Sequence, residues 1–235
     1  MTRLTVITLL FLFVACKQQP INIWLAGDST MAWKKPSRSP ESGWGEGLKL
    51  YVNENTMVHN HAASGRSSKS FIDEGRWQNM VDSLKKGDYV IIQFGHNDEK
   101  TKEKLHTTPY GTFKENLKKF IEESKQKGAN PIVCSSIVRR QFNPDGTLKD
   151  THGDYITAAE EIAKETKILY VDMEYLTHEL VTEMGPDKSK EIYNYTSRKQ
   201  DSTHLNVKGA VRVAELFVKE IKARHLPLSA YLNNK

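Results

Sequence analysis

Cysteine is scarce in this chain, which has only Cys16 and Cys134 among its 235 residues. Cys16 follows an N-terminal apolar segment and is expected to be modified, so the remaining thiol has no partner for an intramolecular disulfide. Stability must therefore come from packing. Cys134 lies in the apolar run 131–134, which is typical of a buried, inert core thiol and not of a nucleophile.

The sequence also lacks a block of charge of one sign. It has 34 lysines and arginines against 29 acidic residues, and the formal charge of +5 falls to +4 if Arg3 is removed with a signal. Because the excess is scattered, nucleic-acid binding has little support. A mildly basic surface would suit a polyanionic substrate such as a pectic polysaccharide, although solvated lysines are the default explanation. Internal repeats and low-complexity tracts are absent, and the length predicts one catalytic domain over residues 21–235.

Long hydrophobic runs are limited to residues 4–15, which follow Arg3 and are too few to span a bilayer. This pattern predicts an export signal over residues 1–15. The sequence Phe13-Val14-Ala15-Cys16 resembles a bacterial lipobox, with Phe where Leu is usual. The resemblance implies cleavage before Cys16, lipidation of that cysteine and a tether over residues 16–20. The alternative is an ordinary secretory signal with a chance cysteine.

The expected location is therefore the bacterial cell envelope, with the chain anchored by a lipid on Cys16. Residues after Cys16 carry no acidic cluster of the kind some surface lipoproteins have, which favours the periplasmic side over the cell surface. Membrane contact is expected only through this anchor.

Short apolar runs alternate with stretches of helical periodicity along the rest of the chain. Strands are predicted at 21–26, 56–59, 89–94, 131–137 and 168–171, and helices at 45–53, 71–84, 113–127, 154–164 and 207–223. This order predicts an α/β fold, a three-layer α/β/α sandwich with a central parallel sheet. In such sheets the ligand lies beyond the carboxyl ends of the strands. The long segments 139–150 and 185–200 are expected to be loops that shape substrate access.

A hydroxyl nucleophile and an Asp/His pair stand at opposite ends of the chain. Gly27-Asp28-Ser29-Thr30 follows the first predicted strand, and Asp201-Ser202-Thr203-His204 comes near the C-terminus. A serine hydroxyl needs an imidazole to take its proton, and the imidazole needs a carboxylate to fix its tautomer. Ser29, His204 and Asp201 are therefore candidate catalytic residues. Alternatively, Asp201 caps the helix that starts near Val207 and His204 is a surface residue.

Two further blocks follow the second and third predicted strands. In residues 61–67, Gly65 can bring a backbone N–H close to a ligand, and in residues 94–98 the Asn97 side-chain amide can supply another. A turn glycine and a self-bonding loop amide are the simpler explanations. His96 and Asp98 have no further ligands at an orderly spacing, so neither a metal nor another cofactor is expected.

Taken together, these blocks resemble the GDSL or SGNH hydrolase superfamily in order and spacing. Residues 63–67, 138–142 and 151–155 look more narrowly like its rhamnogalacturonan acetylesterase branch. The resemblance implies a flavodoxin-like sandwich in which Ser29 attacks an ester carbonyl, His204 is the base and Asp201 orients it. It also implies an oxyanion hole formed by the backbone amides of Ser29 and Gly65 and the side chain of Asn97.

Arg139 and Arg140 follow the fourth predicted strand, where a guanidinium fork would pair well with the carboxylate of galacturonate. Equally, they can tie down the following loop through its own acidic residues. Trp33 and Trp44 flank the nucleophile loop and could stack on sugars, but packing is the commoner role of such tryptophans.

The sequence thus predicts an exported serine esterase, expected to be monomeric, that removes O-acetyl groups from a plant cell-wall polysaccharide. Rhamnogalacturonan is the leading substrate, and acetylated xylan or another glycan follows. The superfamily scaffold also permits a lipid or thioester hydrolase. A non-catalytic glycan-binding lipoprotein is the alternative from another class.

Overall fold

The computed structural model describes residues 19–233. The predicted signal, Cys16 and the first part of the tether lie outside the described residues, so export and lipidation stay predictions. None of the helices in the described part is long and apolar enough to cross a membrane.

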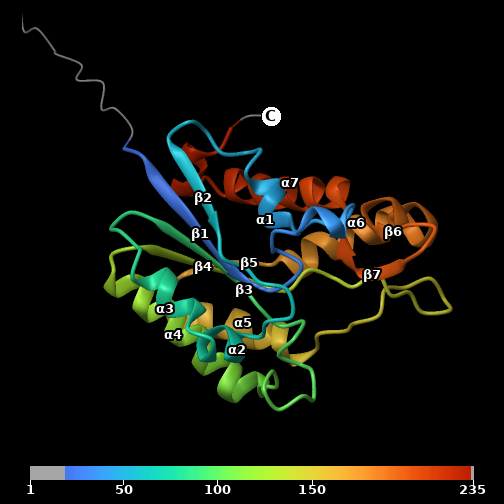
Figure 1. Cartoon of the computed structure of the whole chain (residues 1–235), viewed down its shortest axis with the longest axis horizontal. Helices are drawn as coiled ribbons and strands as arrows, with labels where there is room; N and C mark the ends of the chain where they lie inside the picture. Colours follow the sequence, from blue (N-terminus) through green and yellow to red (C-terminus); the bar gives the residue numbers. More distant parts are fainter. Residues whose placement is uncertain (1–18, 234–235) are drawn as a thin grey trace, which may run out of the picture.

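A parallel sheet forms the centre of the part of the chain described here (Figure 1). Its spatial order is β2-β1-β3-β4-β5, and every neighbouring pair runs parallel. The strands are β1 (Ile21–Gly27), β2 (Thr56–Asn60), β3 (Tyr89–Gln93), β4 (Asn130–Cys134) and β5 (Leu169–Val171). The predicted three-layer fold is confirmed.

Helices cover both faces of the sheet (Figure 1). One layer contains α1 (Trp44–Leu48), α6 (Met173–Lys188) and α7 (Val207–Ala223), and the other contains α2 (Ser68–Asp73), α3 (Arg76–Val81), α4 (Lys114–Gln126) and α5 (Asp154–Glu165). Shorter helical turns are η1 (Pro36–Arg38), η2 (Pro109–Phe113), η3 (Ser189–Ile192) and η4 (Pro227–Tyr231).

The inner strands contribute to two separate cores because successive side chains point to opposite faces. In β1, Ile23 and Leu25 pack with α1 and α7, whereas Trp24 and Ala26 pack with α2 to α5. Burial of both faces explains why the strands are nearly continuous apolar runs in the sequence. Cys134 is buried in the first of these cores, as predicted.

The structure corrects three of the predicted elements. The single helix predicted over 71–84 is two helices, since Gly75 adopts a left-handed φ of 70° between α2 and α3. The helix predicted over 45–53 ends at Leu48, and the strand predicted over 131–137 ends at Cys134. Terminal residues of elements are the least constrained by periodicity.

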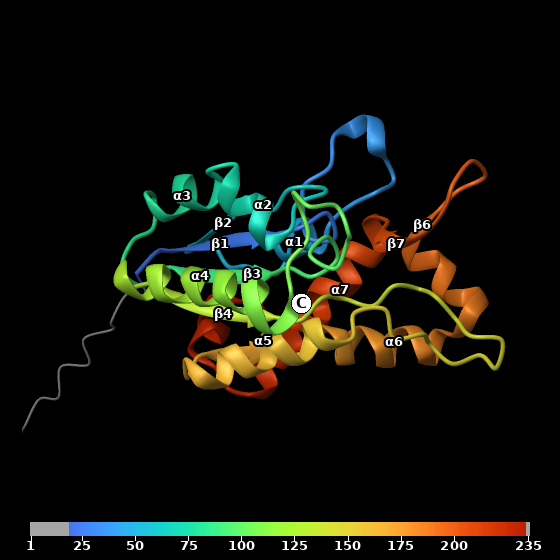
Figure 2. The same ribbon diagram turned by 90° about the horizontal axis from the view of Figure 1, so that it is seen from below.

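The segment 185–200 is only partly a loop, because it holds the end of α6 and most of an antiparallel hairpin. The hairpin consists of β6 (Tyr193–Tyr195) and β7 (Gln200–Leu205). Figure 2 shows it extending beyond the same end of the molecule as the loop between β1 and α1. This hairpin carries Asp201 and His204, so its position decides whether a site can form.

Candidate active site

Three loops that carry predicted site residues leave neighbouring strands. Because β1 lies between β2 and β3, the segments after these strands bring Ser29, Gly65 and Asn97 to one edge of the sheet. This is the carboxyl edge, where ligands bind in open parallel sheets.

The turn after β1 is held in shape by its own polar groups. Asp28 is fully buried, and its Oδ1 accepts hydrogen bonds from the backbone N and the Oγ1 of Thr30, both at 2.8 Å. Gln93 at the end of β3 donates to Thr30 Oγ1 at 2.7 Å and accepts from Trp44 Nε1 at 2.7 Å. The nucleophile turn is thereby fixed to the sheet and to α1, and Trp44 has the packing role that the sequence favoured.

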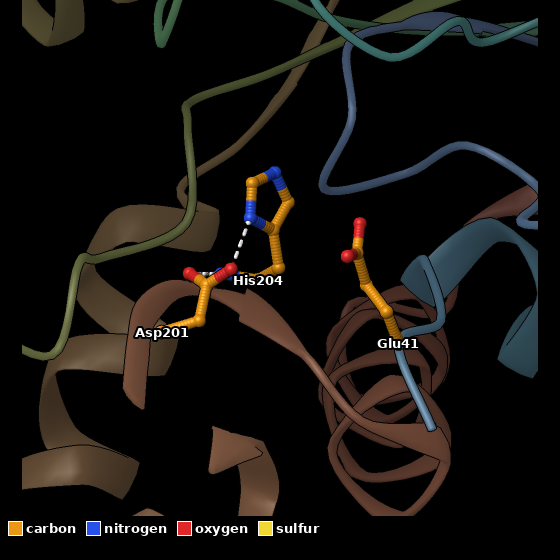
Figure 3. A group of neighbouring side chains, drawn as sticks. All are labelled: Glu41, Asp201 and His204. Atoms are coloured by element: carbon orange, nitrogen blue, oxygen red, sulfur yellow. Dashed lines mark hydrogen bonds and ion pairs between the residues drawn. The ribbon is translucent and has the colours of Figure 1, made fainter. Parts of the chain in front are cut away.

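Ser29, His204 and Asp201 form a continuous hydrogen-bonded chain. Ser29 Oγ lies 2.9 Å from His204 Nε2, and His204 Nδ1 lies 2.9 Å from Asp201 Oδ2 (Figure 3 shows the Asp201 contact). Since an ionised carboxylate only accepts, Asp201 places the imidazole proton on Nδ1. Nε2 is then free to accept the proton of the Ser29 hydroxyl. The geometry is that of an activated serine nucleophile.

Asp201 itself is fixed by backbone and ionic contacts. Its Oδ1 accepts hydrogen bonds from the amides of Thr203 and His204, both at 3.0 Å, and Lys199 Nζ lies 2.6 Å from Oδ2. Burial opposes ionisation, but the hydrogen bonds from His204 and Lys199 outweigh it and hold the pKa of Asp201 well below its ordinary value. Asp201 is not the cap of α7, because the side chain of Asn206 has that role.

The two other predicted oxyanion donors have contrasting surroundings. Gly65 has a φ of 81°, and no atom lies within 4 Å of the place a side chain would occupy, so its backbone faces open space. Asn97 is buried, donates from Nδ2 to Arg66 O at 3.0 Å and accepts from Lys100 Nζ at 2.6 Å. An amide nitrogen carries two hydrogens, so one remains to serve a ligand. Their catalytic roles stay predictions.

Arg139 and Arg140 are both engaged inside the protein. Arg139 pairs with Glu99, which follows β3, and donates to the backbone oxygens of His96 and Thr151. This differs from the expectation that an acid of the following loop would hold it.

Arg140 is 8% exposed and fixes the far side of the hairpin. It donates to Ser189 Oγ at 2.9 Å, to Tyr195 OH at 2.7 Å and to Pro186 O, and its guanidinium lies over the Tyr195 ring. A guanidinium with these partners has few N–H donors free for a substrate. We therefore assign both arginines a structural role around the site. Trp33, in contrast, is 55% exposed.

A second carboxylate close to His204 was missed by the sequence reasoning. Donor atoms of Glu41, Asp201 and His204 lie within 4.8 Å of one another (Figure 3). Such a group can hold a metal, but its carboxylates are already paired with cations. Glu41 pairs with Lys34 at 2.9 Å and with Arg38 at 2.8 Å, and Asp201 pairs with Lys199. We therefore assign these carboxylates to an ion-pair network.

Comparison with known proteins agrees with this geometry. The model of the GDSL-like lipase/acylhydrolase family matches residues 25–212. The chain belongs to this family. The chain is similar to a rhamnogalacturonan acetylesterase of Bacillus subtilis, 37% identical over 92% of this chain and 95% of the relative. A rhamnogalacturonan acetylesterase of Emericella nidulans is 31% identical over 89% of this chain and 88% of the relative.

Solved structures show the same fold. The protein YxiM of Bacillus subtilis superposes with a TM-score of 0.79 at 28% identity, over 89% of this chain and 58% of that one. An acetyl xylan esterase from Geobacillus stearothermophilus superposes with a TM-score of 0.63 at 20% identity, over 86% and 95% of the two chains. The chain is accordingly a carboxylic ester hydrolase, and the predicted resemblance is confirmed.

Proposed function

We propose that this esterase removes O-acetyl groups from an acetylated plant polysaccharide outside the cytoplasm, with rhamnogalacturonan as its substrate. The observation that carries the catalytic part is the unbroken chain from Ser29 Oγ through His204 to Asp201. The names of the two acetylesterase relatives support the substrate. Each relative aligns over most of its own length, so the comparison involves whole catalytic domains.

The geometry supports a two-step acyl transfer. Ser29 Oγ bonds to the acetyl carbonyl carbon while its proton passes to His204 Nε2. The amides of Ser29 and Gly65, with Asn97 Nδ2, would bind the oxyanion. His204 then returns the proton to the departing sugar oxygen, leaving acetyl-Ser29. Water attacks this ester with His204 as base, and acetate leaves with Ser29 restored.

The charge around the site suits a substrate that contains uronate groups. Lys34, Arg38 and Lys199 stand beside the carboxylates of Glu41 and Asp201, so cations outnumber anions in this cluster. Arg38 and Lys199 have side chains about half exposed, and a passing carboxylate can approach them. Exposed charges of this kind attract a polyanion without fixing its register.

Acetate release from acetylated rhamnogalacturonan, acetylated xylan and a small acetyl ester tests the proposal, with Ser29→Ala as the blank. We expect release mainly from the pectic substrate and loss of turnover by several orders of magnitude in the folded variant. Release mainly from xylan would overturn the substrate but keep the mechanism. Rates that rise with acyl chain length would indicate a lipid or thioester hydrolase. Sugar binding without any hydrolysis would indicate a glycan-binding protein. Activity retained in Ser29→Ala would show that Ser29 is not the nucleophile.

A further inference from the structure

Glu41 is buried in a position that an ordinary surface ion pair does not explain. Its side chain is 1% exposed, and its carboxylate meets Lys34 at 2.9 Å, Arg38 at 2.8 Å and Lys199 at 3.5 Å. Burial opposes ionisation, but the bonds from Arg38 and Lys34 outweigh it and lower the pKa of Glu41 to about 2. A permanent negative charge is therefore held inside the protein.

This charge lies where the nucleophile loop meets the hairpin of the catalytic base. Glu41 forms a β-bridge with Asn206, and the Ser42 amide donates to Leu205 O at 2.9 Å. These contacts attach the loop after β1 directly behind His204. Figure 3 shows the Glu41 carboxylate approaching the imidazole from a different segment than Asp201, and atoms of all three side chains lie within 4.8 Å of one another.

Lys199 connects the two carboxylates. Its ammonium lies 2.6 Å from Asp201 Oδ2 and 3.5 Å from Glu41 Oε2. Without Glu41, the positive charges of Lys34, Arg38 and Lys199 would face His204 with Asp201 as their main counter-ion. Like charges repel more strongly at a partly buried site than in water.

The chemistry makes His204 positive in each transition state, when it has taken a proton from Ser29 or from water. We propose that Glu41 is a positioning residue of the catalytic centre that stabilises this imidazolium and keeps the neighbouring cations from opposing it. The inference rests on the proposed esterase mechanism of Ser29 and His204.

Several other charged groups also face the imidazole. Asp201 and Lys199 come from the hairpin, Lys34 and Arg38 come with Glu41 from the loop after β1, and Asp28 and His96 approach from the ends of β1 and β3. Burial raises the pKa of Asp28 and lowers that of His96. Asp28 is therefore a poorer compensating charge than Glu41, and His96, held neutral, adds no charge.

The test is the pH dependence of kcat for Glu41→Gln on a small acetyl ester. Losing the charge makes the imidazolium less stable, so we expect kcat to fall on the order of tenfold or more and the acid-limb midpoint to move about one pH unit lower. KM should change little. Glu41→Asp, which keeps the charge, should restore the midpoint. Glu215→Gln is the matched control, because Glu215 also pairs with two cations but lies on α7.

A merely structural Glu41 would give a different result. Glu41→Gln would then lower the melting temperature and kcat but leave the midpoint at its wild-type pH, which overturns the proposal. Should Glu41→Gln fail to fold, Arg38→Gln is the second test. Arg38 is 55% exposed, and its loss removes a positive charge from the cluster, so the charge of Glu41 is less compensated and the midpoint should move upward. An unmoved midpoint in folded Arg38→Gln would also overturn it. Failure of the esterase mechanism is recognised separately, by an active Ser29→Ala.

Discussion

At the scale of single residues, Asp98 joins the strand ends that form the site. It is fully buried after β3 and accepts hydrogen bonds from the backbone N and the Oγ of Ser68, the first residue of α2, and from Thr107 Oγ1 at 3.2 Å. Burial raises the pKa of Asp98 to about 7, against the opposing effect of the Ser68 bonds. Asp98 therefore links the segment that contains Gly65 to the one that contains Asn97 through a group that titrates near neutrality.

The raised pKa predicts a specific pH dependence of stability. Between its ordinary value of 3.8 and about 7, the folded state binds more protons at Asp98 than the unfolded state does. Its contribution is thus fully present below pH 3.8 and is lost as pH rises to about 7. Asp98→Asn removes the titration, so its unfolding free energy relative to wild type should rise over this window by up to a few kcal/mol and stay level above it.

Denaturant unfolding of both proteins at intervals from pH 4 to pH 8 measures this difference. Asp145→Asn is the control, because the Asp145 pKa is lowered by Thr147 and the group is exposed. A difference in unfolding free energy between Asp98→Asn and wild type that stays constant from pH 4 to pH 8 would show that Asp98 does not titrate in this window.

Motif spacing was sufficient to find some site residues and not others. Ser29, Asp201 and His204 were proposed because a serine nucleophile needs specific partners, which stand in short, recognisable blocks, and the structure brings the three side chains together. Glu41 was missed because a glutamate among lysines and arginines in a loop is usually a solvated ion pair. Only the fold shows that its side chain is buried behind the imidazole.

At the scale of elements, the strands that feed two cores were predictable and the hairpin was not. Strands β1, β3 and β4 are apolar because both of their faces are covered, and this leaves a clear signal. The sequence of β7, Gln200–Leu205, is polar at nearly every position, since it borders the active site and contributes mainly Leu205 to the core. The polar residues that border the site interrupt the apolar pattern by which strands are predicted.

Arg140 supports this hairpin, and replacing it distinguishes a structural role of the side chain from a role in substrate binding. Arg140→Ala leaves the buried Ser189 Oγ without its donor, which costs about 1–3 kcal/mol, and also removes the donors to Tyr195 OH and Pro186 O. We expect a melting temperature lower by several degrees and a fall in kcat, even on a small acetyl ester, because the hairpin carries Asp201 and His204.

Melting curves and steady-state kinetics on both the small ester and the pectic substrate check this. Arg212→Ala, which removes an exposed arginine on α7, should change neither the melting temperature nor kcat. An Arg140→Ala protein with unchanged melting temperature and a raised KM for the uronate-containing substrate alone would instead support the original expectation that Arg140 binds galacturonate.

At the scale of the whole molecule, we expect a lipid on Cys16 to hold the enzyme at a membrane while the domain that begins at Ile21 performs the chemistry. Cys16 and Cys134 offer a matched pair, because Cys134 is buried in the core and burial raises its pKa far above its usual value. An inert thiol of this kind neither acquires a lipid nor affects anchoring.

Expression in a bacterial host with a labelled fatty acid, followed by fractionation, tests the anchor. We expect wild type and Cys134→Ala to carry label in the membrane fraction. Cys16→Ala should lose the label and leave that fraction, because each buried methylene of an acyl chain contributes about 0.8 kcal/mol to membrane binding. Its kcat on a small acetyl ester should be unchanged, since Ser29, His204 and Asp201 lie in the folded domain. An unlabelled wild type of shortened mass in the soluble fraction would instead show an ordinary secretory signal.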